Sequence, residues 1–228
     1  MAALIVDNSF WQIFPEAKIY YLVVHNINNQ SDDSVSYHTM LDIATQKAQK
    51  FLQELDFKEN PLISSGRLAF TKFKKKKGAR SSIEALLKRV SKGAQLHSIN
   101  PLVDLYNSIS LEYGAPFGGE DLDSIKGTMH LGTANGGEVF FPLGANKNEL
   151  ALPNELIYYD TVGAICRSLN WRDAQRTMLT EKTKNAILIT EGITSEQQTN
   201  SLVAIKELQK RIAKQLCVPS TLRIINVK

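Results

Sequence analysis

The chain has 228 residues, 43% of them apolar and 22% charged, and a formal net charge of +4 at pH 7. This length supports one sizeable hydrophobic core, and two cysteines, Cys166 and Cys217, are too few for a disulfide framework. The first residues lack the basic start of a signal peptide, and no apolar run is long enough to span a bilayer. We therefore expect a cytoplasmic protein with no membrane contact.

The first sixty residues predict one strand and one helix. Residues Ile19–Val24 are mostly β-branched or aromatic, which favours a buried strand. The next apolar residues recur at three- and four-residue spacing and so share one helical face: Leu41, Ala44, Ala48, Phe51 and Leu55. The pair Asn60–Pro61 then interrupts this pattern.

Basic residues are concentrated between Arg67 and Lys92. That segment holds ten basic residues against one acid and carries +9, so the rest of the chain carries 4 − 9 = −5. Such asymmetry predicts a cationic surface suited to a polyanion, and a solvated lysine loop without a partner is the alternative. The residues expected to contact nucleic acid are Lys74, Lys75, Lys76, Lys77, Arg80, Lys88 and Arg89.

Two helices are predicted next. Ser81 and Glu84 have the spacing of a capping box, and an apolar stripe follows up to a plausible stop at Gly93. The pair Asn100–Pro101 has the character of an N-cap and first residue of a second helix, which runs toward Gly114. That helix opens into a loop that is rich in glycine and acidic residues: Gly118, Gly119, Glu120 and Asp121.

The second half of the chain predicts short strands and one long helix. The predicted strands are Glu138–Phe141, Leu156–Asp160, Val162–Cys166, Ala186–Thr190 and Leu222–Val227. A second capping box at Ser195 and Gln198 begins an amphipathic helix that reaches Leu216. We therefore expect a single α/β domain over residues 1–228, with a mixed, mostly antiparallel sheet and flanking helices.

Several common functional motifs are absent from the sequence. Neither of the usual glycine-rich phosphate-binding motifs is present, and the four histidines have no metal-ligand spacing. Neither cysteine lies in a recognisable nucleophile motif. We therefore expect no cofactor and no metal, and covalent catalysis has no obvious candidate.

The segment from Asn100 to Leu122 resembles part of the B3/B4 domain of the phenylalanyl-tRNA synthetase β subunit, the module that edits mischarged tRNA. The residues that carry the match are Asn100, Val103, Asp104, Asn107, Leu111, Glu112, Gly114, Pro116, Asp121 and Leu122. Stand-alone B3/B4 (tRNA-editing) domain proteins are similar over residues 10–227. There the similarity extends to RSSIEALLKRV, LVDLYNSIS, GGEDLDSIKG, FPLG and CRSLNWRDAQRT.

This resemblance implies an editing site, with departures from the family pattern. The family uses a Thr-Asn pair, a His after the Pro, and a Glu near a glycine-rich turn. Here Tyr106 stands at the Thr position, Gly118 stands at the His position and Asn107 is retained. The glycine-rich turn corresponds to residues Asn170–Asp173, and the position equivalent to the Glu is not assigned.

Hydrolysis of an aminoacyl ester needs a positioned water and donors for the oxyanion, and no side-chain nucleophile. We assign catalytic roles to Asn107, Tyr106 and Asp173. Substrate-binding roles are assigned to Gly118, Gly119, Glu120, Asp121, Asn170 and Arg172. In the alternative, Asn107 braces its helix, Gly118 and Gly119 form a turn, and Arg172 pairs with Asp173 on the surface.

Two functions remain open. The first is a free-standing factor that hydrolyses the ester of a mischarged tRNA. The second is a non-catalytic module that binds tRNA or an amino acid on an inherited editing fold. Both predict that the Asn100–Gly114 helix and the Cys166–Asp173 segment face one concave pocket, although about 60 residues separate them in sequence.

Overall fold

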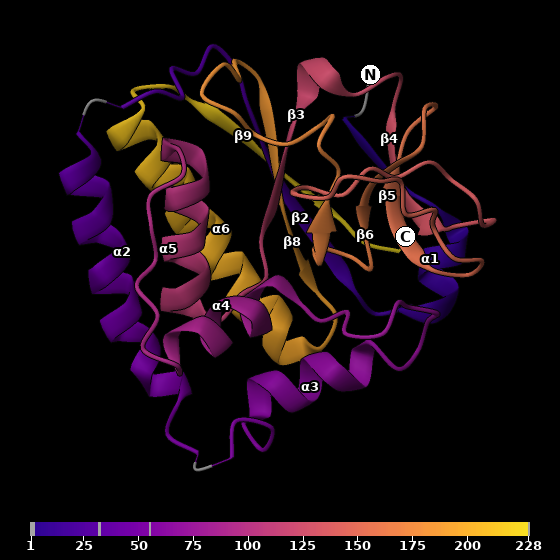
Figure 1. The fold of residues 1–228 in the computed structure, drawn as a ribbon, viewed down its shortest axis with the longest axis horizontal. Helices are drawn as coiled ribbons and strands as arrows, with labels where there is room; N and C mark the ends of the chain where they lie inside the picture. Colours follow the sequence, from indigo (N-terminus) through magenta and orange to yellow (C-terminus); the bar gives the residue numbers. More distant parts are fainter. Residues whose placement is uncertain (1–2, 32, 55, 228) are drawn as a thin grey trace.

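The structure is a computed structural model that describes residues 3–31, 33–54 and 56–227. The described chain forms two β-sheets and a set of helices (Figure 1). The four-stranded sheet has the order β3-β8-β2-β9, and all its neighbours are antiparallel. Its strands are β3 (Gly118–Asp121), β8 (Ala186–Gly192), β2 (Lys18–Val24) and β9 (Ser220–Ile225).

The second sheet has five strands in the order β1-β4-β5-β6-β7. Its strands are β1 (Leu4–Val6), β4 (Met129–Thr133), β5 (Leu156–Tyr159), β6 (Ala164–Arg167) and β7 (Arg172–Asp173). Only the β1–β4 pair is parallel among the described strand pairs. The expectation of mixed but mostly antiparallel pairing is therefore confirmed, with two sheets in place of one.

Helices α6, α5 and α2 cover one face of the four-stranded sheet, whereas α1 packs against β4 of the other sheet. Figure 1 shows α6 lying against that sheet, with α5 and then α2 stacked outside it. The helices are α1 (Asn8–Ile13), α2 (Ser34–Ala48), α3 (Pro61–Ala69), α4 (Ser82–Val90), α5 (Pro101–Tyr113) and α6 (Ser195–Gln215). Two 3-10 turns, η1 (Gln49–Phe51) and η2 (Leu122–Ser124), follow α2 and β3. No described helix combines the length and the apolar character that crossing a bilayer requires.

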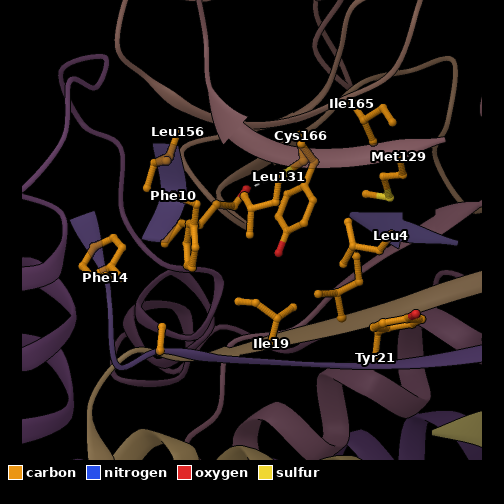
Figure 2. Packing of buried hydrophobic residues seen from close by; sticks show 14 of the residues in the cluster. Leu4, Phe10, Phe14, Ile19, Tyr21, Met129, Leu131, Leu156, Ile165 and Cys166 are labelled. Carbon is orange, nitrogen blue, oxygen red and sulfur yellow. Dashed lines mark hydrogen bonds between the residues drawn. The ribbon is translucent and has the colours of Figure 1, made fainter. Parts of the chain in front are cut away.

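Both faces of strand β2 are buried, which explains why its sequence is continuously apolar. Successive side chains of a strand point to opposite faces, and both faces of β2 are buried. Ile19 and Tyr21 enter the core between the two sheets, together with Leu131 and Leu156 of the other sheet (Figure 2). Tyr20, on the opposite face, packs in the core formed with α5 and α6.

The predicted start and end of α5 are confirmed. Asn100 is the N-cap and accepts a hydrogen bond from the Val103 amide at 3.1 Å, and Pro101 is the first helical residue. Asn29 fixes this end further, because its side chain donates to Asn100 Oδ1 at 3.0 Å. Gly114 ends the helix with a φ of 66°, a conformation that glycine adopts without a Cβ penalty. This precise anchoring sets the direction in which the exposed face of α5 points.

Other predicted boundaries are wrong, for identifiable local reasons. The helix through Leu41 ends at Ala48, and Leu55 lies outside the described residues. The pair Asn60–Pro61 was predicted only as an interruption. It also begins a helix, because Asn60 is the N-cap of α3. The predicted box at Ser195 and Gln198 is shifted by one residue: the structure has it at Thr194 and Gln197.

Three further differences concern strands and caps. Residues 138–141 are not a strand, because their backbone oxygens bond to loop amides such as that of Ala151. Residues 118–121, expected as a loop, form β3. The Ser81 cap does accept from the Glu84 amide at 3.3 Å, but the Glu84 carboxylate does not return to the cap. It binds Arg67 of α3 at 2.7 Å instead.

Candidate functional site

A cleft of about 550 Å³ lies where α4, α5 and the edge strand β3 meet the segments 170–173 and 178–181. Its volume is within the range of about 300–1,000 Å³ that is usual for small-molecule sites. The common pocket was predicted for the Asn100–Gly114 helix and the Cys166–Asp173 segment; of that segment, only Asn170, Trp171 and Asp173 line this cleft together with α5. Its apolar walls are formed by Leu86, Val103, Phe117, Leu143, Trp171 and Leu179.

Two neighbouring residues of α5 supply polar groups to this cleft. Tyr106 and Asn107 both line it and both are half-buried. Neither side chain makes a hydrogen bond to any residue that the structure describes. Burial raises the pKa of the Tyr106 phenol well above 10, and the nearby carboxyls of Asp173 and Glu120 raise it further. Tyr106 is therefore a neutral hydroxyl at physiological pH, and the Asn107 amide is free to bind a ligand.

Gly118 and Gly119 lie side by side on β3 but serve the cleft differently. A Cβ on Gly118 would overlap Oδ1 of Asn170, so the absence of a side chain makes room for that amide. A Cβ on Gly119 would lie 2.7 Å from Leu188 and 3.3 Å from the ring of Tyr106. Gly119 lines the cleft, whereas Gly118 does not.

The N–H group of Gly119 points away from β8, toward the side of β3 on which Glu120 forms an isolated bridge with Met178. The Asp121 amide donates to Thr177 O at 2.8 Å, on the side of β3 that faces away from β8. Residues two apart in a strand point their N–H groups to the same side, so the Gly119 N–H shares that orientation. It is a main-chain donor at the edge of the cleft.

Glu120, Cys166 and Asp173 form a compact cluster behind the cleft wall. The thiol sulfur and one oxygen of each carboxyl all lie within 4.8 Å of one another. Glu120 and Cys166 are buried, and Asp173 is part of the cleft wall. Burial raises the pKa of Glu120 well above 4.5, and the Asp173 charge adds to this effect. The pKa of Asp173 is also raised by burial, and that of the Cys166 thiol is raised well above 9 by burial.

The remaining predicted substrate-binding residues lie in different surroundings. Asn170 lines the cleft and also donates to the Glu191 carboxylate at 2.6 Å. Arg172 lies outside the cleft lining and pairs with Glu149 at 3.6 Å, not with Asp173. Asp121 is also outside the lining, where its carboxylate accepts from the Thr183 hydroxyl at 2.7 Å.

Three of the seven predicted nucleic-acid residues, Lys75, Arg80 and Lys88, border a separate groove of about 410 Å³ on the other side of α4. Its basic members are Arg67, Lys75, Arg80 and Lys88, with Glu84 as the acidic one. Lys76 lies outside this groove and pairs with Glu149 at 2.5 Å. Lys74 and Lys77 are exposed, and neither forms an ion pair within the described chain. Arg89 is on the other face of α4 and lines the cleft.

The sequence matches the family model for the B3/4 domain over residues 65–223, which is well over half of the chain. The chain belongs to the B3/4 domain family. The fold is also similar to the crystal structure of an N-terminal fragment of the phenylalanyl-tRNA synthetase β subunit from Pyrococcus horikoshii, with a TM-score of 0.51 and 15% identity. The alignment covers 97% of this chain and 50% of that fragment, so the B3/4 protein spans half its length. No curated protein matches the sequence.

The site of this B3/4 protein includes groups that the sequence did not single out. Cys166 was dismissed for lack of a nucleophile motif, yet it lies within the carboxyl cluster. Arg89 was assigned to the nucleic-acid surface, yet it faces the cleft. The only signal for Cys166 was its place at the start of the CRSLNWRDAQRT segment, which also carries Asp173.

Proposed function

We propose that this B3/4 protein is a free-standing factor that hydrolyses the ester of a mischarged aminoacyl-tRNA. The observation that carries the proposal is the arrangement around α4. One face of this helix borders a cleft with uncommitted hydrogen-bonding groups, and the other borders a groove dominated by basic side chains. An aminoacyl end in the cleft and a phosphate backbone along the groove would use both faces together.

The chemistry assigned to the cleft is addition of water to the ester carbonyl. The bond between the carbonyl carbon and the ribose oxygen breaks, and the ribose oxygen takes up a proton. In this proposal the Gly119 N–H and the Asn107 amide, which both line the cleft, would donate to the carbonyl oxygen as it becomes negative. The Tyr106 hydroxyl is a neutral donor beside them, available to the departing ribose oxygen. Asp173 lies on the same wall, where it orients the attacking water.

The side chain of the amino acid would lie against the apolar walls of the cleft. Trp171, Leu179 and Val103 provide aromatic and aliphatic surface there. Arg89 and Glu181 line the same cleft and add one charge of each sign. A cleft of this composition favours an apolar or amphipathic aminoacyl group over a small charged one.

The test is deacylation of a panel of aminoacyl-tRNAs, followed by release of the amino acid. We expect at least one mischarged species to be hydrolysed, and Asn107→Ala to slow it by about 100-fold, because one preorganised transition-state contact is lost. Asn200→Ala, the same substitution on α6 outside the cleft, serves as the matched control and should leave the rate unchanged. Circular dichroism would confirm that both variants fold.

A different result would support the second function. If no aminoacyl-tRNA is hydrolysed above background, while tRNA or a free amino acid binds and Asn107→Ala weakens that binding, the protein is a recognition module. The departures at Tyr106 and Gly118 from the family's editing pattern make this the alternative to test.

A further inference from the structure

The cluster behind the cleft wall brings together three potential metal ligands from three different strands. Glu120 is on β3, Cys166 is on β6 and Asp173 is on β7. Their ligand atoms lie within 4.8 Å of one another. Glu120 is 3% exposed and Cys166 is 1% exposed, so two of the three groups are removed from bulk water.

One carboxylate oxygen of this cluster has no partner. Oε2 of Glu120 is fully buried and makes no hydrogen bond within the part of the chain that the structure describes. Thr177 is near enough to favour the ionised form, yet its Oγ1 makes no hydrogen bond either. A buried oxygen of this kind is costly unless a donor or cation compensates it.

The neighbouring arginines make their hydrogen bonds and ion pairs elsewhere, although the charge of Arg176 is near enough to lower the pKa of Glu120. Arg167 binds Glu155 at 2.5 Å. Arg176 makes two hydrogen bonds to the Asp160 carboxylate, at 2.7 and 2.8 Å. Arg172 is turned toward Glu149. The two carboxyls and the thiol are therefore left without a fixed cationic partner among the described residues.

We propose that Glu120, Cys166 and Asp173 bind a divalent transition-metal ion, with Zn²⁺ as the best fit. The thiol selects against Mg²⁺ and Ca²⁺, which take oxygen ligands, and a mixed sulfur and carboxylate set suits tetrahedral zinc. In such a tetrahedron the ligand atoms lie about 3.5 Å apart, from metal–ligand distances of roughly 2.0–2.3 Å. Ligand atoms that lie within 4.8 Å of one another would need to approach by about 1 Å at most to reach this geometry.

Metal binding would replace the hydrogen bond of the Cys166 thiol by a bond from its sulfur to the ion. Its Sγ now donates to Leu169 O at 2.9 Å, and coordination as the thiolate releases that proton. Three protein ligands leave a fourth tetrahedral position, and Asp173 places the ion at the cleft wall. If the proposed hydrolysis is correct, a water at that position would be the nucleophile. The metal site itself does not depend on that function.

The experiment uses the full chain after dialysis against a chelator, titrated with Zn²⁺ by calorimetry and with Co²⁺ by absorption. We expect one equivalent of either ion to bind, with a near-ultraviolet thiolate-to-Co²⁺ charge-transfer band. Cys166→Ser should abolish the band and weaken Zn²⁺ binding at least about 10-fold. Cys217→Ser removes the other cysteine, which is exposed, and is the matched control that should change neither.

Glu120→Gln tests the site without altering the thiol. Glutamine keeps the shape of the side chain and cannot carry a buried charge, so we expect the variant to fold. It should weaken Zn²⁺ binding while the charge-transfer band persists at saturating Co²⁺. Absence of stoichiometric binding to the wild-type chain, or binding that survives Cys166→Ser and Glu120→Gln unchanged, would overturn the site. Stoichiometric binding without any deacylation would retain the site and refute the proposed function, so the two failures are distinguishable.

Discussion

The buried carboxyl of Glu191 makes the stability of the fold depend on pH near neutrality. Glu191 lies on β8 and is 2% exposed. It accepts hydrogen bonds from the Tyr158 hydroxyl at 2.7 Å and the Asn170 amide at 2.6 Å, and it has no ion pair with a described residue. Burial outweighs these two donors and raises its pKa from 4.5 to about 7. We predict that Glu191→Gln stabilises the protein at alkaline pH.

The magnitude follows from the shift of about 2.5 pKa units, each equivalent to about 1.4 kcal/mol, which gives a total of roughly 3–4 kcal/mol. The raised pKa means that the folded state retains this proton while the unfolded state loses it. The stabilising contribution is therefore complete below pH 4.5 and is lost as pH rises through about 7. Most of this contribution is lost between pH 5 and pH 8.

The assay is urea unfolding of the wild type and of Glu191→Gln at several pH values between 5 and 8. Taking the difference between the two proteins at each pH cancels the other titrating groups. The glutamine variant should gain relative stability steadily across this range. Asn170 can accommodate the new amide by rotating its own side-chain amide group. Glu59→Gln, an exposed carboxyl, is the control and should track the wild type. A difference that stays constant with pH would refute the assignment of a buried neutral carboxyl.

Three further predictions concern other parts of the molecule. Lys88→Ala, in the groove, should lower the salt slope of tRNA binding by roughly 0.7–0.9 log units per log unit of salt, while Lys214→Ala on α6 leaves it unchanged; equal slopes for all three proteins would remove Lys88 and its groove from the interface. Arg167→Ala should cost about 3–5 kcal/mol in urea unfolding, because it leaves Glu155 buried and unpaired; a loss below 1 kcal/mol would contradict this. Gly114→Ala should cost more than about 1 kcal/mol in the same assay, because the residue has a φ of 66° and its surroundings are filled; an unchanged midpoint would argue against the left-handed cap.

Local sequence signals were sufficient to predict the ends of helix α5 and the position of strand β2. Asn100–Pro101 and Gly114 fixed both ends of α5, because a cap, a first-turn proline and a left-handed glycine act within one turn. The continuous apolar run of Ile19–Val24 identified β2, since both faces of that strand are buried. The sequence analysis does not predict strands β1, β3, β4 and β7, which are all short; β1 and β3 in addition pair with strands that are distant in sequence.

The candidate site was predictable only in part, for the same reason. Tyr106 and Asn107 are neighbours on one helix, so a single resemblance located both. The carboxyl cluster was not foreseen, because Glu120 and Cys166 are brought together by two different sheets. The ion pair of Arg172 with Glu149 could not be predicted from the sequence either, because the two residues are 23 positions apart. The adjacent residue Asp173 was the partner that the sequence suggested.

The departure at Gly118 is better explained as a replacement than as a loss. The family pattern has a histidine at this position, and here the chain has no side chain at all. The structure shows that the space beside Gly118 is filled by the Asn170 amide, whose Oδ1 lies where a Cβ would be. Asn170 comes from the second half of the chain and is held in place by Glu191. The glycine at 118 therefore leaves room for the Asn170 amide, a polar group from another segment that lines the cleft.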